Sequence, residues 1–321
     1  MSAPRKRVAL VIGAGSVKCA AALGLWKVLR REGIDLDMVV GCSGGSIYAA
    51  SMALGYDVDE SERMTLQMWN RTVTQRRDYA SMLGAFLPKL FKFRGHFEMI
   101  HGEPLLRTLE KGFGGRTFAE TRIPLYIVAT ELLSGQQATL SSGRIVDAVR
   151  ASIAIPYIWA PWEVDGKLML DGCLSAPLPV DVAIKEGADV ILAMGFESPY
   201  PRRIKSATSY AFHVNSIYTN NLFRANYSFH NLAHHAEILP IVPDFGEPVN
   251  LFDTHKFGHV IDCGARAAEE QLPYLRQLLV LPAAGASAST PASTPVSAPT
   301  SAAASVTASA PMRAPDAPEL R

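Results

Sequence analysis

The sequence is poor in cysteine and has almost no excess charge. Only 4 of its 321 residues are cysteines, and no two of them form a CxxC pair. This argues against both a disulfide framework and a zinc knuckle, and it favours a reducing compartment. The 31 basic and 30 acidic residues leave a net charge of +1. A protein that binds the phosphate backbone usually carries a clear positive excess, so no nucleic-acid partner is expected.

Long apolar runs are also missing. No stretch of about 20 uncharged apolar residues occurs, so we expect no transmembrane helix. Arg5-Lys6-Arg7 and the apolar residues up to Leu25 superficially resemble a secretory signal, but Gly13, Gly15 and Lys18 interrupt them. The chain is therefore expected to be cytoplasmic, with any membrane contact being peripheral.

The composition divides the chain into two parts. Of the last 40 residues, 31 are Ala, Ser, Thr or Pro. Such a segment buries too little apolar surface to offset an ordering cost of roughly 1 to 2 kcal/mol per residue. We predict a disordered tail over residues 282–321 and one compact domain over residues 5–281, where no repeat or internal linker is evident. The sequence indicates no oligomeric state.

The order of the expected elements predicts an α/β fold. Val8–Ile12 is a continuous apolar run, typical of a strand buried on both faces. An Ala- and Leu-rich helix should follow and stop at Gly33, because glycine commonly ends helices. Further strands are expected at Met38–Val40, Leu125–Ala129 and Val190–Met194, further helices up to Leu54 and over Val180–Gly187, and a hairpin over Trp162–Leu170. Alternating strands and helices favour a parallel sheet, which the hairpin makes mixed.

Gly41-Cys42-Ser43-Gly44-Gly45 fits the pattern Gly-x-Ser-x-Gly where an apolar strand passes into a helix. A sharp turn at this point needs glycines beside the serine and presents its hydroxyl at a helix N-terminus. A Gly/Ser-rich turn can match five residues by chance, so the flanking strand and helix are the evidence. They make Ser43 the candidate nucleophile.

A nucleophilic serine needs a base, and two kinds are available. The chain order Ser, Asp, His of α/β-hydrolases is satisfied by six downstream histidines, none in a distinctive setting: His213, His230, His234, His235, His255 and His259. The other candidate is Asp171, a carboxylate at the end of an apolar strand and followed by Gly172. An Asp-Gly pair is also an ordinary turn, so the residues alone leave the choice open.

Gly13-Ala14-Gly15-Ser16-Val17-Lys18 lies between the first strand and the first helix. It does not fit a dinucleotide-binding loop, because Lys18 occupies the place of the third glycine, and it lacks the spacing of a Walker loop. Small residues in such a turn leave backbone N–H groups free for an anion, so an oxyanion hole is the better explanation. Lys18 either acts electrostatically on this loop or is a solvated lysine.

Several ordered blocks resemble the patatin-like phospholipase family, in particular its short bacterial members. The resemblance covers residues 8–200 and becomes vague beyond them. The blocks that carry it are Gly13-x-Gly15-x-x-Lys18, Gly41-x-Ser43-x-Gly45, Ala129-Thr130-Glu131 with Ser134-Gly135, Ala151-Ser152-Ile153-Ala154-Ile155-Pro156, and Asp171-Gly172.

The resemblance implies a three-layer α/β/α fold with a mixed, mostly parallel central sheet, and a serine acyl hydrolase that needs no cofactor or metal. Ser43 would be the nucleophile and Asp171 its general base. The amides of Gly15 and Ser16, together with Ala14, would form the oxyanion hole. Lipid esters, in phospholipids or lysophospholipids, would be the substrates. Since a free Asp is a weak base at neutral pH, we expect an apolar pocket around Asp171.

Two departures from the family pattern concern cysteines. The family usually has glycine at position 19 and glycine or alanine at position 173, where this chain has Cys19 and Cys173. We expect the loop to keep the backbone conformation of the family if Cys19 has a negative φ. With Cys42, these residues are either small packing groups or a thiol cluster whose oxidation blocks the site.

Two other functions and one surface segment stay open at this point. A histidine-dependent α/β-hydrolase and a non-catalytic regulatory protein on the same fold both fit the residues. The segment over residues 82–94 is apolar with interleaved basic residues. It is expected either to make peripheral membrane contact and cover the site, or to face the core with its lysines solvated.

Overall fold

The computed structural model describes residues 5–68, 98–197, 200, 203–204, 207–233, 235–250 and 253–279. The segment predicted to contact membranes, residues 82–94, and the predicted tail, residues 282–321, lie outside the described residues. Among the described helices, none combines the length and the apolar character needed to cross a bilayer.

The described strands form one mixed sheet in the order β5-β6-β3-β2-β1-β7-β8, with β4 paired to β3. The pairs β1–β2, β1–β7, β2–β3 and β7–β8 are parallel, whereas β3–β4, β3–β6 and β5–β6 are antiparallel. The strands are β1 (Val8–Ile12), β2 (Met38–Cys42), β3 (Leu125–Glu131), β4 (Gln137–Leu140), β5 (Trp162–Val164), β6 (Lys167–Asp171), β7 (Val190–Met194) and β8 (Glu237–Ile241). This confirms the mixed, mostly parallel sheet.

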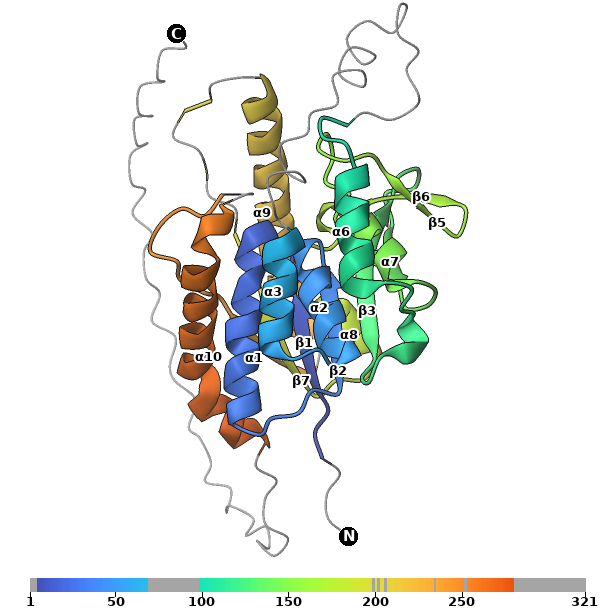
Figure 1. Cartoon of the computed structure of the whole chain (residues 1–321). Helices are drawn as coiled ribbons and strands as arrows, with labels where there is room; N and C mark the ends of the chain where they lie inside the picture. Colours follow the sequence, from blue (N-terminus) through green and yellow to red (C-terminus); the bar gives the residue numbers. More distant parts are fainter. Residues whose placement is uncertain are drawn as a thin grey trace, which may run out of the picture. The chain divides into compact units, whose positions relative to one another are not determined.

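Helices cover both faces of the sheet (Figure 1). One face carries α1 (Ala21–Arg31), α2 (Gly44–Leu54), α3 (Val58–Met68), α6 (Glu103–Phe113), α7 (Ile145–Ser152) and α10 (Phe257–Leu279), and the other carries α8 (Val180–Lys185) and α9 (Ala207–Ala233).

The apolar core follows this division. Because successive side chains of a strand point to opposite faces, Leu10 of β1 joins the core beneath α1, α2 and α10, whereas Val11 joins the core beneath α8. The layers are those of the predicted α/β/α fold.

Local sequence explains where the expected elements begin and end. The first helix starts as the 3₁₀ helix η1 (Ser16–Ala20), becomes α-helical at Ala21 and ends at Arg31, just before the predicted stop at Gly33. The predicted hairpin turn is present, with positive φ at both Asp165 and Gly166. That geometry matches the twist of the two flanking strands, β5 and β6.

Candidate active site

Ser43 occupies a strained turn between β2 and α2. Its φ of 53° and ψ of −131° lie in a region that costs of the order of 1 to 3 kcal/mol for a residue other than glycine. The first turn of α2 packs closely against the end of β1, since a Cβ added at Gly45 would lie 2.4 Å from the carbonyl oxygen of Ile12. Packing therefore holds the strained turn, and Gly41 and Gly45 allow the close approach that the motif predicts.

Two serine hydroxyls hold the backbone of Ser43, one of them from a second element. Its N–H donates to Ser152 Oγ at 2.9 Å, and Ser152 Oγ donates in turn to the carbonyl oxygen of Val128 at 2.6 Å. Ser46 Oγ donates to the carbonyl oxygen of Ser43 at 2.7 Å. The sequence identified Ser152 only as part of a family block and did not predict its contact with the backbone of Ser43.

Asp171 is the last residue of β6, and the antiparallel pairing of β6 with β3 brings it beside the turn that carries Ser43. Its Oδ2 accepts a hydrogen bond of 2.6 Å from Ser43 Oγ, across 128 positions of sequence. Its Oδ1 accepts a bond of 2.9 Å from the backbone N–H of Cys173, at the start of the 3₁₀ helix η3 (Gly172–Leu174). Both carboxylate oxygens are thus oriented.

Burial makes Asp171 a stronger base than an ordinary aspartate. Its side chain is fully buried, and this burial raises its pKa to about 6, against the opposing effect of the bonds from Ser43 and Cys173. The desolvation effect dominates because a charged carboxylate loses hydration that two hydrogen bonds only partly replace. At pH 8 the group is ionised and able to accept a proton.

The glycine loop, residues 13–18, lies against the turn that carries Ser43. A Cβ added at Gly44 would lie 3.1 Å from the backbone nitrogen of Ser16, a residue with a positive φ of 52°. The N–H of Ala14, however, donates to the carbonyl oxygen of Pro177 at 2.8 Å. Ala14 is therefore not available as the third oxyanion donor that the resemblance implied, because its only N–H is already bonded.

Lys18 is buried, so its interpretation as a solvated lysine is wrong. Its Nζ donates to the carbonyl oxygen of Glu197 at 2.6 Å, and burial lowers its pKa to about 8. This bond ties the glycine loop to the segment that follows β7. The contact gives Lys18 a structural and electrostatic role.

The three cysteines beside the motifs are buried thiols. Burial raises the pKa of Cys19, Cys42 and Cys173, which disfavours the thiolate that oxidation and alkylation require. Cys19 is not among the residues with positive φ, and its Sγ donates to the carbonyl oxygen of Gly13 at 3.3 Å. The packing interpretation is the one that these contacts favour, and the loop accommodates the cysteine.

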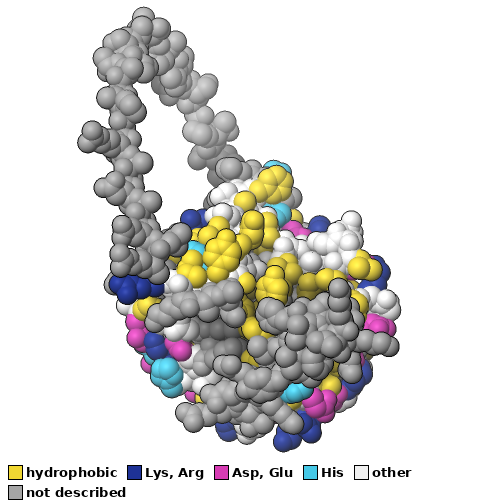
Figure 2. All heavy atoms as spheres, turned by 90° about the horizontal axis from the view of Figure 1, so that it is seen from above, with side chains coloured by type: hydrophobic (Ala, Val, Ile, Leu, Met, Phe, Trp, Pro, Cys, Tyr) yellow, Lys and Arg dark blue, Asp and Glu magenta, His cyan; other side chains and the backbone are white. Residues whose placement is uncertain are grey.

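Ser43 and Asp171 line a cavity of about 480 Å³. Figure 2 looks onto the end of the molecule at which β1 and β2 end, and hydrophobic side chains gather there. The cavity has an apolar wall and a wall built largely by α9. Its lining residues include Gly15, Ser16, Lys18, Met99, Ile100, Ile155, Ile158, Phe196, Ser209, Phe212, His213, Ser216, Thr219, Asn220, Phe223, Val249 and Asn250.

Residues 10–184 match the family model described as patatin-like phospholipase. The matched stretch is more than half of the chain and contains the glycine loop, the nucleophile turn and Asp171. The chain belongs to the patatin-like phospholipase family. The predicted resemblance is thus confirmed, and the family is consistent with the layered α/β fold described above.

Relatives of this patatin-like chain occur in bacteria and animals. It is 32% identical over 188 residues to an uncharacterized NTE family protein of Mycobacterium tuberculosis, covering 59% of this chain and 48% of the relative. It is 27% identical over 190 residues to patatin-like phospholipase domain-containing protein 6 of Homo sapiens, covering 58% and 13%. The chain therefore spans about half the length of the mycobacterial relative. Among solved structures, VipD from Legionella pneumophila matches 85% of this chain and 68% of that chain, with a TM-score of 0.49 and 14% identity.

Proposed function

We propose that this protein is a serine acyl hydrolase that cleaves carboxylic esters of phospholipids or lysophospholipids through a Ser43–Asp171 dyad. The observation that carries the proposal is the 2.6 Å hydrogen bond from Ser43 Oγ to a fully buried carboxylate whose pKa is raised to about 6. Family membership supports a lipid ester as the substrate class. An open cavity at Ser43 favours catalysis over a regulatory role with a filled site.

The mechanism follows from these positions. Asp171 accepts the proton of Ser43 as Oγ attacks the ester carbonyl, and the backbone N–H groups of Gly15 and Ser16 stabilise the oxyanion. The proton then passes to the leaving alcohol, and the acyl group stays on Ser43. Water activated by Asp171 hydrolyses the acyl-enzyme in the second half of the cycle. One oxyanion donor typically contributes about 2.7 to 4 kcal/mol to transition-state stabilisation.

The test is hydrolysis of a lipid panel by wild type, Ser43→Ala and Asp171→Asn. Both variants should lose at least about 1,000-fold in kcat while keeping the folded state, because each removes half of a unit that acts together. Wild-type kcat/KM should fall as the pH drops through about 6, where Asp171 becomes protonated. Substantial turnover by either variant would refute the dyad.

His213 provides the control for the histidine-dependent alternative. It is the one histidine of the described part of the chain that lines the cavity, and the Ser43 hydroxyl bonds to Asp171 instead. His213→Ala should therefore retain activity within about tenfold, since it supplies no proton acceptor to Ser43. If His213→Ala is inactive and Asp171→Asn is active, the histidine-dependent mechanism replaces the dyad.

A fluorophosphonate probe separates catalysis from the non-catalytic alternative. An activated Ser43 should be labelled in wild type and in His213→Ala, but labelling should be lost in Ser43→Ala. Absence of labelling in folded wild type would favour the regulatory protein.

A further inference from the structure

A second cavity, of about 390 Å³, lies at the end of α2 opposite to Ser43. Ser43 directly precedes α2, whereas Met52 and Gly55, the residue that follows this helix, line the second cavity, so roughly 16 Å of helix separates the two places. Helix α1 packs against both α2 and α3 (Figure 1). The ends of these three helices and the residues before β2 and β3 enclose this distal cavity, which shares no lining residue with the cavity at Ser43.

Apolar side chains make up most of the distal cavity. Ile34, Leu36, Val58 and Ile123 pack against the core but are only partly buried, and each of them lines the cavity. Trp26 adds an aromatic side chain from α1. The volume lies within the range of small-molecule sites, which are typically apolar with a few convergent polar groups. The lining therefore favours a ligand with an apolar portion.

Two exposed arginines complete the lining, and neither guanidinium has a hydrogen-bond or ion-pair partner in the described part of the chain. Arg30 belongs to the last turn of α1. The side chain of Arg122 runs over Gly55, since a Cβ added there would lie 2.4 Å from Arg122 Cδ. The partial negative charge of helix C-termini favours cations at both places. It leaves the N–H donors of the two guanidinium groups unused.

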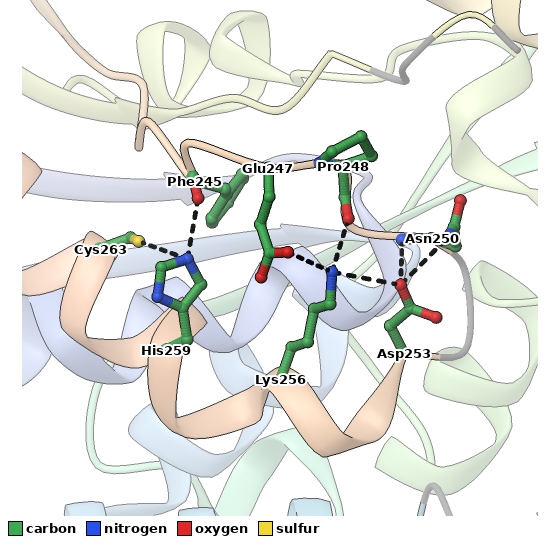
Figure 3. A network of polar contacts seen from close by, with 8 residues as sticks. All are labelled: Phe245, Glu247, Pro248, Asn250, Asp253, Lys256, His259 and Cys263. Atoms are coloured by element: carbon green, nitrogen blue, oxygen red, sulfur yellow. Dashed lines mark hydrogen bonds and ion pairs between the residues drawn. The ribbon is translucent and has the colours of Figure 1, made fainter. Parts of the chain in front are cut away.

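Lys256 illustrates the contrast with a cation whose donors are satisfied within the chain. Its Nζ lies 3.1 Å from Glu247 Oε2 and 3.9 Å from Asp253 Oδ2, and it donates to the carbonyl oxygen of Pro248 at 2.8 Å (Figure 3). The donors of the two arginines in the distal cavity face solvent instead, so they are available to a ligand that carries oxygen acceptors.

The other polar groups of the lining do not cancel this preference. Asp57 is the N-cap of α3, and its Oδ1 accepts the N–H of Glu60 at 2.6 Å. The hydroxyl of Tyr56 donates to the carbonyl oxygen of Gly112 at 3.0 Å. Asp35 is exposed and has no partner among the described residues. An anion thus meets two free guanidinium groups and one free carboxylate, whereas a cation meets the reverse.

We propose that the distal cavity binds an organic anion in which a carboxylate is joined to an apolar chain, as in a medium-chain fatty acid. The carboxylate accepts hydrogen bonds from Arg30 and Arg122, because planar guanidinium groups match carboxylates in charge and geometry. The chain covers the partly buried apolar residues of the lining. This inference does not depend on hydrolysis at Ser43, since no residue of the distal cavity takes part in it.

The test is a titration of ¹⁵N-labelled full-length protein with decanoate at pH 8, below the micellar concentration of decanoate. The indole N–H resonance of Trp26, assigned by its loss in Trp26→Phe, reports on the distal cavity, so decanoate bound beside Ser43 is not counted. We expect a saturable shift with a Kd of the order of 0.1 mM, a modest value for a ligand of this size.

Charge variants decide whether the arginines bind the carboxylate. Arg30→Gln/Arg122→Gln should raise the Kd at least about tenfold, because it removes charge-assisted hydrogen bonds. Arg63→Gln is the matched control, since Arg63 is an exposed arginine of α3 that also has no partner among the described residues and does not line the cavity. Its Kd should stay within about twofold of wild type. Asp35→Asn should lower the Kd about two- to threefold by removing a like charge.

Decyltrimethylammonium presents the opposite charge on a chain of the same length, and it should bind at least about tenfold more weakly than decanoate. Equal affinities would show purely apolar binding, and tighter binding of the ammonium, with weakening in Asp35→Asn, would show a cation site. Either result overturns the inference, as does an unmoved Trp26 resonance or an unchanged Kd in the double arginine variant. All of these outcomes leave the Ser43–Asp171 hydrolase standing, because its own variants test it.

Discussion

The full burial of Asp171 has two consequences: it raises the proton affinity of the carboxylate, and it lowers the stability of the fold at alkaline pH. Full burial raises its pKa to about 6, and the rise above the ordinary value corresponds to roughly 3 kcal/mol. The sign follows from proton binding. Between the unfolded and folded pKa values the folded protein holds the proton more tightly, so the stability contributed by the protonated group is lost as the pH rises through about 6.

Asp171→Asn should therefore stabilise the protein at alkaline pH. The neutral amide avoids the buried charge, and it keeps both partners if Oδ1 accepts from Cys173 while Nδ2 donates to Ser43 Oγ. We expect a free energy of unfolding about 2 to 3 kcal/mol above that of wild type at pH 8, with the difference shrinking towards zero at pH 4. Urea unfolding at both pH values measures it. An equal difference at both would show that the buried charge is not the cause.

At the scale of elements, the site depends on α7 as much as on the turn that carries Ser43. The C-terminal residue of this helix, Ser152, links the backbone of Ser43 to the carbonyl oxygen of Val128 in β3. Helix α7 thereby joins the turn that carries Ser43 to the strand that pairs with β6, which carries Asp171. This three-element connection helps to hold Ser43 and Asp171 at their 2.6 Å hydrogen bond.

Ser152→Ala should lower kcat by about 10- to 100-fold with a smaller change in KM. The substitution leaves the N–H of Ser43 buried without its acceptor, which costs about 1 to 3 kcal/mol and loosens the strained turn. Steady-state kinetics and urea unfolding are measured together. Ser51→Ala is the control, because Ser51 is equally buried but bonds only to the carbonyl oxygen of Ile47 in α2. Equal losses of stability with kcat unchanged in both would make Ser152 purely structural.

At the scale of the whole folded unit, residues beyond the family match complete the layer that covers the sheet. Helix α10 packs against α1 (Figure 1), and the two backbones approach closely at glycines. A Cβ added at Gly264 would lie 2.0 Å from the carbonyl oxygen of Ala21, and one at Gly24 would lie 1.9 Å from that of Ile261. The first helix, which follows the glycine loop, is thus held by one of the last elements of the described chain.

Gly264→Ala should destabilise the protein by about 3 kcal/mol, because its Cβ meets backbone that cannot rotate away. Gly258→Ala in the same helix is the matched control: its Cβ would meet no atom within 4 Å, so better helix propensity should leave stability unchanged or raise it by up to about 1 kcal/mol. Denaturant unfolding of both variants measures the difference. Similar stabilities for the two would show that α1 and α10 separate without penalty.

The local signals in the sequence predicted a large part of the fold and the members of the site. Strand β1, the hairpin turn at Asp165-Gly166 and the Gly-x-Ser-x-Gly turn are each specified by adjacent residues, so they were readable without a partner. The interpretation of Lys18 as a solvated residue was wrong, because the charge of a lysine by itself favours exposure. Its burial depends on the hydrogen bond to the carbonyl oxygen of Glu197, 179 positions away. Ala14 was misassigned because its N–H donates to the carbonyl oxygen of Pro177, which is also a distant residue.

What the sequence determined by itself are features that short-range chemistry enforces: apolar strands, small residues at sharp turns, and a serine between glycines. Only the tertiary structure decided which groups meet. The pairing of β6 with β3 brings Asp171 to Ser43, and the orientation of α9 turns Ser216 and Thr219 into the cavity although its sequence has no strong amphipathic pattern. The physical reason is that burial, hydrogen-bond partners and hence pKa values depend on neighbours brought together from distant parts of the chain.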